Sequence, residues 1–170
     1  MSLFKWWEES YEWWEESYAA LKVQINTYLE TYEKHYGMLD CKDKIVVDIG
    51  ADYGSTARFF LSRGARRIIA YESNPVLRAK LLREFLFDGR VEIHGCWDGV
   101  MPAGDILKMD CEGCEYKMSE LQLNSFKQWA VGLHCPRRLA PEVLQFEAML
   151  RRNGGRMIED MGFERLWLKK

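Results

Sequence analysis

A short glycine-containing segment follows the first apolar run of the chain. It reads Asp48-Ile49-Gly50-Ala51-Asp52-Tyr53-Gly54, and a helix-forming stretch begins directly after it. Two glycines let the backbone turn tightly and approach a ligand, and the helix that follows presents its first N–H groups there. The Gly-x-x-x-Gly spacing differs from the Gly-x-Gly-x-x-Gly of dinucleotide-binding proteins. We therefore predict a cofactor-binding loop formed by Asp48, Gly50, Ala51, Asp52, Tyr53 and Gly54.

An acid follows the second apolar run at the distance expected for a ribose-binding group. This run ends in Tyr71-Glu72-Ser73-Asn74-Pro75, with Glu72 eighteen residues beyond Gly54. In nucleotide-binding sheets, a carboxylate about 20 residues after the glycine loop accepts hydrogen bonds from ribose hydroxyls. The alternative is a turn with a surface acid. We expect Glu72, together with Ser73 and Asn74, to bind a cofactor.

Polar groups also follow the next three predicted strands. The third strand leads into Gly95-Cys96-Trp97-Asp98-Gly99, in which Trp97 offers a flat wall and Asp98 an acceptor for an adenine amino group. Asp110 and Glu112 follow the fourth strand, and His134 ends the fifth. These last three residues are the candidates for a catalytic base or for contacts to a substrate hydroxyl.

Cysteines gather near the same strand ends. Cys111 and Cys114 form a C-x-x-C, and a zinc or redox site could add residues from neighbouring strand ends, namely His94, Cys96, His134 and Cys135. The alternative is that these cysteines are small buried residues. Five cysteines at irregular spacing do not form the even framework of a secreted scaffold. We expect reduced thiols and no metal, with a labile disulfide as the main alternative.

An alternating order of strands and helices would bring these residues together. Apolar runs predict strands at residues 44–49, 67–71, 91–94, 105–109 and 130–134, with helices at 55–63, 75–87 and 115–121. A helix that begins at Pro141 and two short strands at 156–159 and 164–168 complete the chain. Such a pattern predicts a parallel sheet covered on both faces, with ligands at the carboxyl ends of its strands. We expect an α/β fold with a doubly wound, mostly parallel, Rossmann-like sheet.

The first 40 residues have a different character. The hexapeptide Trp6-Trp7-Glu8-Glu9-Ser10-Tyr11 recurs seven residues later as Trp13-Trp14-Glu15-Glu16-Ser17-Tyr18. An apolar stripe continues from it at helical spacings to Tyr32. We expect residues 1–40 to form a long amphipathic helical extension and residues 41–170 to form the cofactor-binding domain. The helix would pack on its own domain, join two chains as a homodimer, or cover the cleft as a lid.

Composition limits the classes of partner. The 170 residues are 48% hydrophobic and 29% charged, which is typical of a soluble globular domain. The formal net charge of -2 argues against binding nucleic acid or a membrane through bulk charge. Arg137 and Arg138 would bind a phosphate or carboxylate of a substrate, or remain on the surface. Without an apolar run of membrane-spanning length or a signal-like N-terminus, we expect a cytoplasmic protein.

Three segments of the chain resemble the successive motifs of the FkbM-type methyltransferases, which are class I S-adenosylmethionine-dependent enzymes. The segments are Val47-Asp48-Ile49-Gly50-Ala51, Tyr71-Glu72-Ser73-Asn74-Pro75 and Leu107-Lys108-Met109-Asp110-Cys111-Glu112-Gly113-Cys114-Glu115, of which the last is the most specific. The resemblance covers about residues 42–135. Gly132 departs from the pattern, because the family often has a Glu at this point of the fifth strand.

The resemblance implies S-adenosyl-L-methionine as the cofactor. Its methionine part would lie over the segment from Asp48 to Gly54, its ribose on Glu72 and its adenine near Asp98. The resemblance also implies methylation of an oxygen on a small-molecule or glycan-like substrate. An Asn-Pro-Pro-Tyr element, used by many amino-group methyltransferases, is absent at Asp110-Cys111-Glu112-Gly113. Two alternatives stay open: an NAD-dependent oxidoreductase on a similar sheet, and a non-catalytic cofactor-binding or assembly protein with the same fold.

Overall fold

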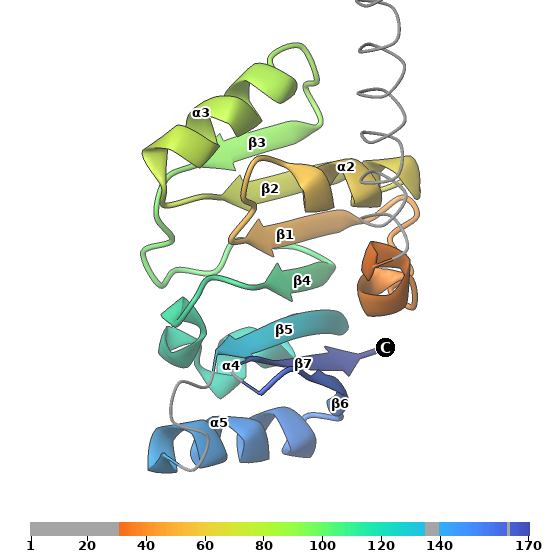
Figure 1. Cartoon of the computed structure of the whole chain (residues 1–170). Helices are drawn as coiled ribbons and strands as arrows, with labels where there is room; N and C mark the ends of the chain where they lie inside the picture. The colour runs from red at the N-terminus through yellow and green to blue at the C-terminus, as the bar shows by residue number, and fades with distance from the viewer. Residues whose placement is uncertain (1–30, 135–139, 163) are drawn as a thin grey trace, which may run out of the picture. The chain divides into compact units, whose positions relative to one another are not determined.

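The computed structural model describes residues 31–134, 140–162 and 164–170 (Figure 1). The chain divides into two compact units, residues 1–34 and 35–170, and the second unit contains the sheet. Most of the predicted N-terminal helix, with its three alternative roles, lies outside the described residues; residues 31–36 are helical. None of the helices in the described ranges has the length and apolar character needed to span a membrane.

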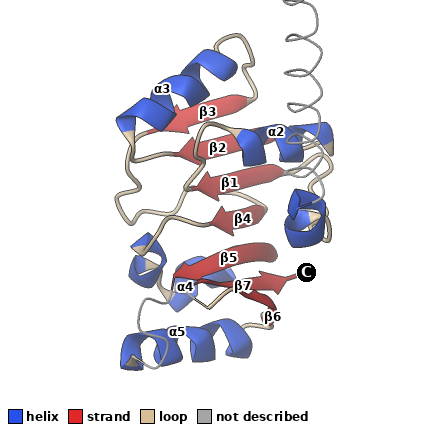
Figure 2. Cartoon of the chain, in the orientation of Figure 1, coloured by secondary structure: helices blue, strands red, loops and turns tan. Residues whose placement is uncertain are grey.

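Seven strands form one sheet in the described part of the chain, in the order β3-β2-β1-β4-β5-β7-β6. Strands β1 to β5 pair in parallel, whereas β7 runs antiparallel to both β5 and β6. The strands are β1 (Ile45–Ile49), β2 (Arg67–Tyr71), β3 (Val91–His94), β4 (Ile106–Met109), β5 (Gln128–His134), β6 (Arg156–Asp160) and β7 (Glu164–Lys169). Figure 2 shows the carboxyl ends of β1 to β5 at the same edge of the sheet. The predicted Rossmann-like, mostly parallel sheet is therefore confirmed.

Helices connect the strands, and two of the predicted ones differ from the structure. The helices are α2 (Ser55–Ser62), α3 (Pro75–Glu84), the 3-10 helix η1 (Cys114–Lys117), α4 (Glu120–Asn124) and α5 (Pro141–Arg152). A single helix over 115–121 is wrong, because Met118 is extended and Ser119 starts a new helix through a capping box with Gln122. Helix α3 ends at Glu84 rather than Phe87, and Phe87 is 96% exposed.

The centre of the sheet is buried on both faces, as the continuous apolar runs predict. Val47 on β1, Leu107 on β4 and Trp129 on β5 are fully buried and belong to one hydrophobic cluster with Trp167 on β7. Two charged side chains, Asp48 and Lys108, lie in neighbouring strands within this apolar layer. The rigid core thus fixes the strand ends from which the loops of the candidate site emerge.

Candidate functional site

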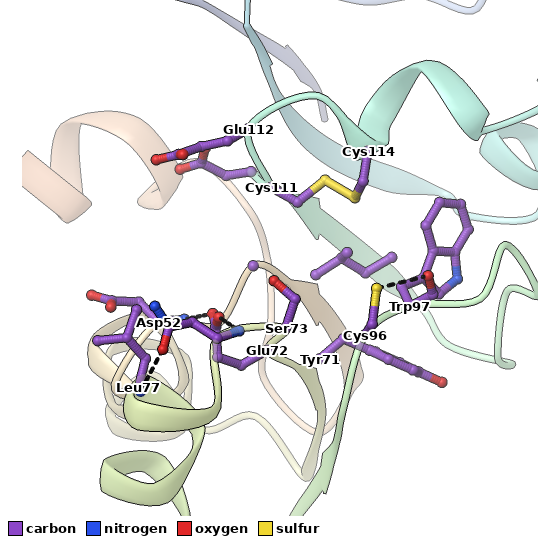
Figure 3. Close-up of a pocket in the computed structure, with 14 residues that line it drawn as sticks. Asp52, Tyr71, Glu72, Ser73, Leu77, Cys96, Trp97, Cys111, Glu112 and Cys114 are labelled. Atoms are coloured by element: carbon purple, nitrogen blue, oxygen red, sulfur yellow. Dashed lines mark hydrogen bonds between the residues drawn. A yellow bond between two sulfur atoms is a disulfide. The ribbon is translucent and has the colours of Figure 1, made fainter.

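A cavity of about 520 Å³ opens at the carboxyl ends of β1 to β4 (Figure 3). This volume is typical of pockets that hold a nucleotide-sized small molecule. The predicted site residues that line it are Gly50, Asp52, Glu72, Ser73, Asn74, Trp97, Asp110 and Glu112. The lining residues that we did not predict are Ile49, Tyr71, Leu77, Cys96, Cys111 and Cys114. Four of these adjoin a predicted residue in sequence, whereas Leu77 and Cys114 come from the first turns of α3 and η1.

Gly50 makes the sharp turn after β1 at which two neighbouring strand ends meet. Its φ is +82°, and a Cβ at this position would lie 1.8 Å from the carbonyl oxygen of Asp110. The N–H groups of Gly50 and Ala51 both donate to the carbonyl oxygen of Tyr71, at 2.9 and 3.0 Å. A residue with a side chain does not fit here, because both the positive φ and the contact with the Asp110 backbone exclude it. The turn therefore brings bare backbone to the cavity wall.

The carboxylate of Glu72 is held rigidly at the edge of this cavity. One oxygen accepts the N–H of Asp52 at 2.9 Å, and the other accepts the N–H of Asn74 at 2.7 Å. The Asn74 side chain in turn caps α3 by accepting the N–H of Val76 at 2.9 Å. Glu72 is only 6% exposed, yet it lines the cavity. Each oxygen keeps a lone pair, so the carboxylate can accept two hydroxyl groups side by side.

Asp48 lies beneath the cavity wall rather than in it. Its carboxylate is fully buried, accepts the Thr56 hydroxyl at 2.5 Å and lies 3.0 Å from the ammonium group of Lys108. Lys108 also donates to the carbonyl oxygen of Gly50 at 2.6 Å. Burial alone would lower the pKa of Lys108, but the negative charges of Asp48 and Asp110 raise it above its ordinary value. The ammonium group therefore stays charged and fixes the turn from below.

The remaining residues of the predicted glycine loop connect it to the helices. Ala51 is fully buried, and Tyr53 is half-buried. Gly54 has a φ of +98°, and a Cβ there would lie 2.6 Å from the Phe85 ring and 2.7 Å from Leu81. Gly54 thus allows the start of α2 to contact the end of α3. None of these three residues belongs to the lining of the cavity described above.

The two predicted residues after β3 differ in their position relative to the cavity. Trp97 lines the cavity, is only 4% exposed and donates its indole N–H to the carbonyl oxygen of Val100 at 2.8 Å. Asp98 is exposed, and its carboxylate accepts the N–H of Val100 at 2.9 Å. Its side chain therefore stabilises the turn, and it is not among the cavity-lining residues. The structure provides the predicted flat wall but not an Asp98 side chain in the cavity.

Two of the three candidate catalytic residues line the cavity, and the third does not. Asp110 and Glu112 line the cavity at the end of β4, where Glu112 has a φ of +54° and starts the turn into η1. His134 ends β5 and is not part of that lining; its Nε2 lies 3.7 Å from Asp110 Oδ1. His134 therefore lies next to a cavity-lining residue without lining the cavity itself.

A buried acid that we did not predict, Glu115, orients His134. Glu115 Oε1 accepts the His134 backbone N–H at 2.8 Å and lies 3.2 Å from His134 Nδ1, and Oε2 accepts the N–H of Gly113 at 2.8 Å. Burial alone would raise the pKa of Glu115, but these hydrogen bonds lower it below its ordinary value. The hydrogen bond to Glu115 raises the pKa of His134 against the opposing effect of burial. An ionised Glu115 therefore keeps a proton on Nδ1 of His134.

The expectation of reduced thiols is wrong for one pair of cysteines. Cys111 and Cys114 form a disulfide in the loop between β4 and η1, and both residues line the cavity. In Figure 3 this disulfide and Glu72 lie on opposite sides of the cavity. The tight turn at Glu112 and Gly113, both with positive φ, brings the two sulfur atoms together. Cys41 and Cys96 are free, whereas Cys135, Arg137 and Arg138 lie outside the described residues.

Comparison with solved structures identifies the fold. The chain superposes on a putative S-adenosylmethionine-dependent methyltransferase from Listeria monocytogenes with a TM-score of 0.61, at 10% identity, over 82% of this chain and 97% of that one. It superposes on Aeropyrum pernix fibrillarin, solved with natively bound S-adenosyl-L-methionine, with a TM-score of 0.56, at 14% identity, over 76% and 67% of the two chains. A putative RNA methyltransferase from Pyrococcus horikoshii gives 0.55, at 17% identity, over 86% and 81%. The fold is therefore that of class I methyltransferases.

Sequence comparison identifies viral relatives. No family model matches the chain. It is 38% identical over 112 residues to "Uncharacterized protein 158B" of Sulfolobus islandicus rod-shaped virus 1, covering 63% of this chain and 71% of the relative. It is 37% identical over 110 residues to "Uncharacterized protein 65" of a Sulfolobus islandicus filamentous virus, covering 63% and 70%. The chain therefore belongs to the same protein family as protein 158B of the rod-shaped virus and protein 65 of the filamentous virus.

Proposed function

We propose that this protein is an S-adenosyl-L-methionine-dependent methyltransferase that methylates a hydroxyl group. The observation that carries the proposal is the Glu72 carboxylate, held by the N–H groups of Asp52 and Asn74 at the edge of a cavity of about 520 Å³. A fixed carboxylate beside a glycine turn is the arrangement that binds a ribose in sheets of this kind. Fibrillarin, which shares the fold, was solved with this cofactor bound.

The proposed binding mode follows from the residues that line the cavity. We place the methionine part over Gly50 and Asp52, because the Gly50 turn leaves room for close approach of a ligand to the backbone. The ribose hydroxyls would donate to Glu72. The adenine would lie against Trp97 and Leu77, since the Asp98 side chain is bonded to the Val100 N–H instead.

The methyl transfer itself requires little covalent chemistry from the protein. S-adenosyl-L-methionine supplies an electrophilic methyl group on a sulfonium. The chain must hold an acceptor hydroxyl in line with that group and provide a base for its proton. Asp110 and Glu112 are the cavity-lining carboxylates that the proposed binding mode does not assign to the cofactor, and His134 Nε2 lies 3.7 Å from Asp110. We propose these three residues for acceptor contacts and proton removal.

An oxygen acceptor on a small-molecule or glycan-like substrate is supported by the FkbM resemblance of three segments. The segment at Asp110-Cys111-Glu112-Gly113 also lacks the Asn-Pro-Pro-Tyr element of many amino-group methyltransferases. The NAD-dependent alternative is disfavoured by the Gly-x-x-x-Gly spacing at Gly50 and Gly54. The non-catalytic alternative predicts cofactor binding without methyl transfer.

Calorimetric titration of the full chain tests the proposal. We expect binding of S-adenosyl-L-methionine and S-adenosylhomocysteine at one site per chain, and no binding of NAD+. Labelled methyl transfer would then be measured to panels of hydroxyl and amine acceptors. Tight NAD+ binding with no heat from either sulfur compound would overturn the proposal. Binding without transfer to any acceptor would favour the non-catalytic alternative.

A further inference from the structure

Three potential metal ligands converge beside the cavity from three different strands. Asp110 follows β4, His134 ends β5 and Glu164 begins β7. One ligand atom from each residue lies within 4.8 Å of those from the other two. Glu164 is brought there by the antiparallel pairing of β5 with β7, in which His134 and Glu164 are partners. Residues far apart in the sequence thus present two carboxylates and one imidazole to one point.

The orientation of His134 matches that of a metal-binding histidine. A metal-binding imidazole usually donates its second ring N–H to a carboxylate or carbonyl group, which fixes its tautomer and direction. Glu115 takes this role, because its buried carboxylate lies 3.2 Å from His134 Nδ1 and also accepts the backbone N–H of His134. With the Nδ1 proton held by Glu115, the lone pair of the neutral imidazole is on Nε2. That nitrogen faces Asp110 at 3.7 Å.

The absence of a side chain at residue 132 leaves room for both carboxylates. A Cβ on Gly132 would lie 2.8 Å from Glu164 Oε1 and 3.2 Å from Asp110 Oδ1. A side chain at position 132 would push the two oxygens away. Gly132 therefore leaves room for the carboxylates on the face of β5 that also carries His134, two residues further along the strand.

Negative charges gather around this point of the sheet. The carboxylates of Asp110 and Glu164 lie on either side of the space above Gly132, and the buried carboxylate of Glu115 lies on the other side of the imidazole. The ammonium group of Lys108, on the neighbouring strand, is bonded to Asp48 and to the Gly50 carbonyl. A cation between Asp110 and Glu164 would offset the repulsion between their carboxylates.

We propose that Asp110, His134 and Glu164 bind a divalent first-row metal ion, with Glu115 as the residue that positions His134. Two carboxylates and an imidazole suit Mn²⁺, Fe²⁺ or Zn²⁺ better than Ca²⁺ or Mg²⁺, which prefer oxygen ligands. Bonds of about 2.1 Å place neighbouring ligand atoms roughly 3.0 to 3.4 Å apart. The three side chains therefore need to move inward only slightly. Because Asp110 also lines the cavity, the ion would lie next to the proposed acceptor site.

Mn²⁺ titration of the full chain, stripped with a chelator, tests this site without any cofactor. Free Mn²⁺ is counted by electron paramagnetic resonance at pH 7.5. We expect one Mn²⁺ per chain, and the spin-echo spectrum of the bound ion should show coupling to one imidazole nitrogen. Glu164→Gln and Asp110→Asn should each weaken binding by about tenfold or more. His134→Gln should abolish the nitrogen coupling.

Glu120→Gln is the matched control, because Glu120 is an exposed carboxylate on α4 that pairs with Arg152. It should bind Mn²⁺ like the original chain.

Gly132→Ala is a second test that leaves every ligand in place, and it should also weaken binding because the Cβ occupies the space between the carboxylates. Thermal melting of each variant shows that it is folded. Failure to bind Mn²⁺ below millimolar concentration, or equal binding by the Glu164→Gln and Glu120→Gln variants, would overturn the site. The proposed function would survive that result, since S-adenosylhomocysteine binding is measured separately in the presence of chelator.

Discussion

Lys108 and Asp48 form a buried ion pair between β4 and β1, directly beneath the turn that forms one wall of the cavity. Both side chains are almost fully inaccessible to solvent, at 2% and 0%. Lys108 also bonds the Gly50 carbonyl, so the pair links the interior of the sheet to the glycine turn. The otherwise apolar interior of the sheet thus contains two buried charges, and each is compensated by the other.

Loss of one member of this pair should be strongly destabilising. Lys108→Met leaves the Asp48 carboxylate buried without its cation, and we expect the free energy of unfolding to fall by about 3 to 5 kcal/mol. The double variant Lys108→Met with Asp48→Asn removes both charges and should recover part of this loss. Urea unfolding followed by circular dichroism measures both. A single variant within about 1 kcal/mol of the original chain would show that the pair is not an essential part of the core.

Glu72 should determine cofactor affinity. Glu72→Ala removes a carboxylate that would accept the ribose hydroxyls, a loss of about 1.5 to 3 kcal/mol, or roughly 10- to 150-fold in affinity. Calorimetric titration with S-adenosylhomocysteine measures this change. Glu84→Gln is the control, because Glu84 is a carboxylate at the end of α3 that pairs with Arg58. Unaltered affinity in Glu72→Ala would mean that the ribose binds elsewhere.

His134 should titrate above the ordinary range of a histidine. Its hydrogen bond to Glu115 raises the pKa, burial opposes this, and the charges of Asp110 and Glu164 add to the increase. Because the folded pKa exceeds the unfolded value of about 6.5, the resulting stability is fully present below pH 6.5 and is lost as the pH rises through the folded pKa. Nuclear magnetic resonance of the imidazole, with chelator present, gives the pKa directly. Glu115→Gln should lower it; an unchanged pKa would contradict the assigned role of Glu115.

Much of the fold follows from local sequence patterns. Strands β2 and β3 have the predicted bounds, because short apolar runs bounded by turn residues are sufficient to define buried strands. The predicted helix at 115–121 was wrong because the cap at Ser119 competes with a continuous helix, and the capping box becomes visible only when Gln122 is considered together with it.

The candidate site was less predictable, since its contacts depend on pairings between distant residues. Glu72 has a recognisable distance from the glycine loop, whereas Glu164 reaches the site only through the antiparallel pairing of β7 with β5. Asp48 belongs to the predicted loop motif, yet it lies beneath the cavity wall because Lys108, on the neighbouring strand, offers a buried partner. Strand alternation alone does not reveal that partner.

The Cys111–Cys114 disulfide should affect both stability and the shape of the cavity. It closes a loop of four residues that also lines the cavity, so reduction releases little chain entropy, and we expect a loss of about 2 kcal/mol in the free energy of unfolding. The same reduction frees the turn at Glu112 and Gly113, which should weaken S-adenosylhomocysteine binding.

The double variant Cys111→Ser with Cys114→Ser should match the reduced protein and should not respond to reductant. Cys96→Ser, in contrast, should respond as the original chain does, because Cys96 is free. Alkylation of the unfolded protein, with and without prior reduction, counts the thiols by mass. Equal counts in the two samples would show that the pair is reduced in solution.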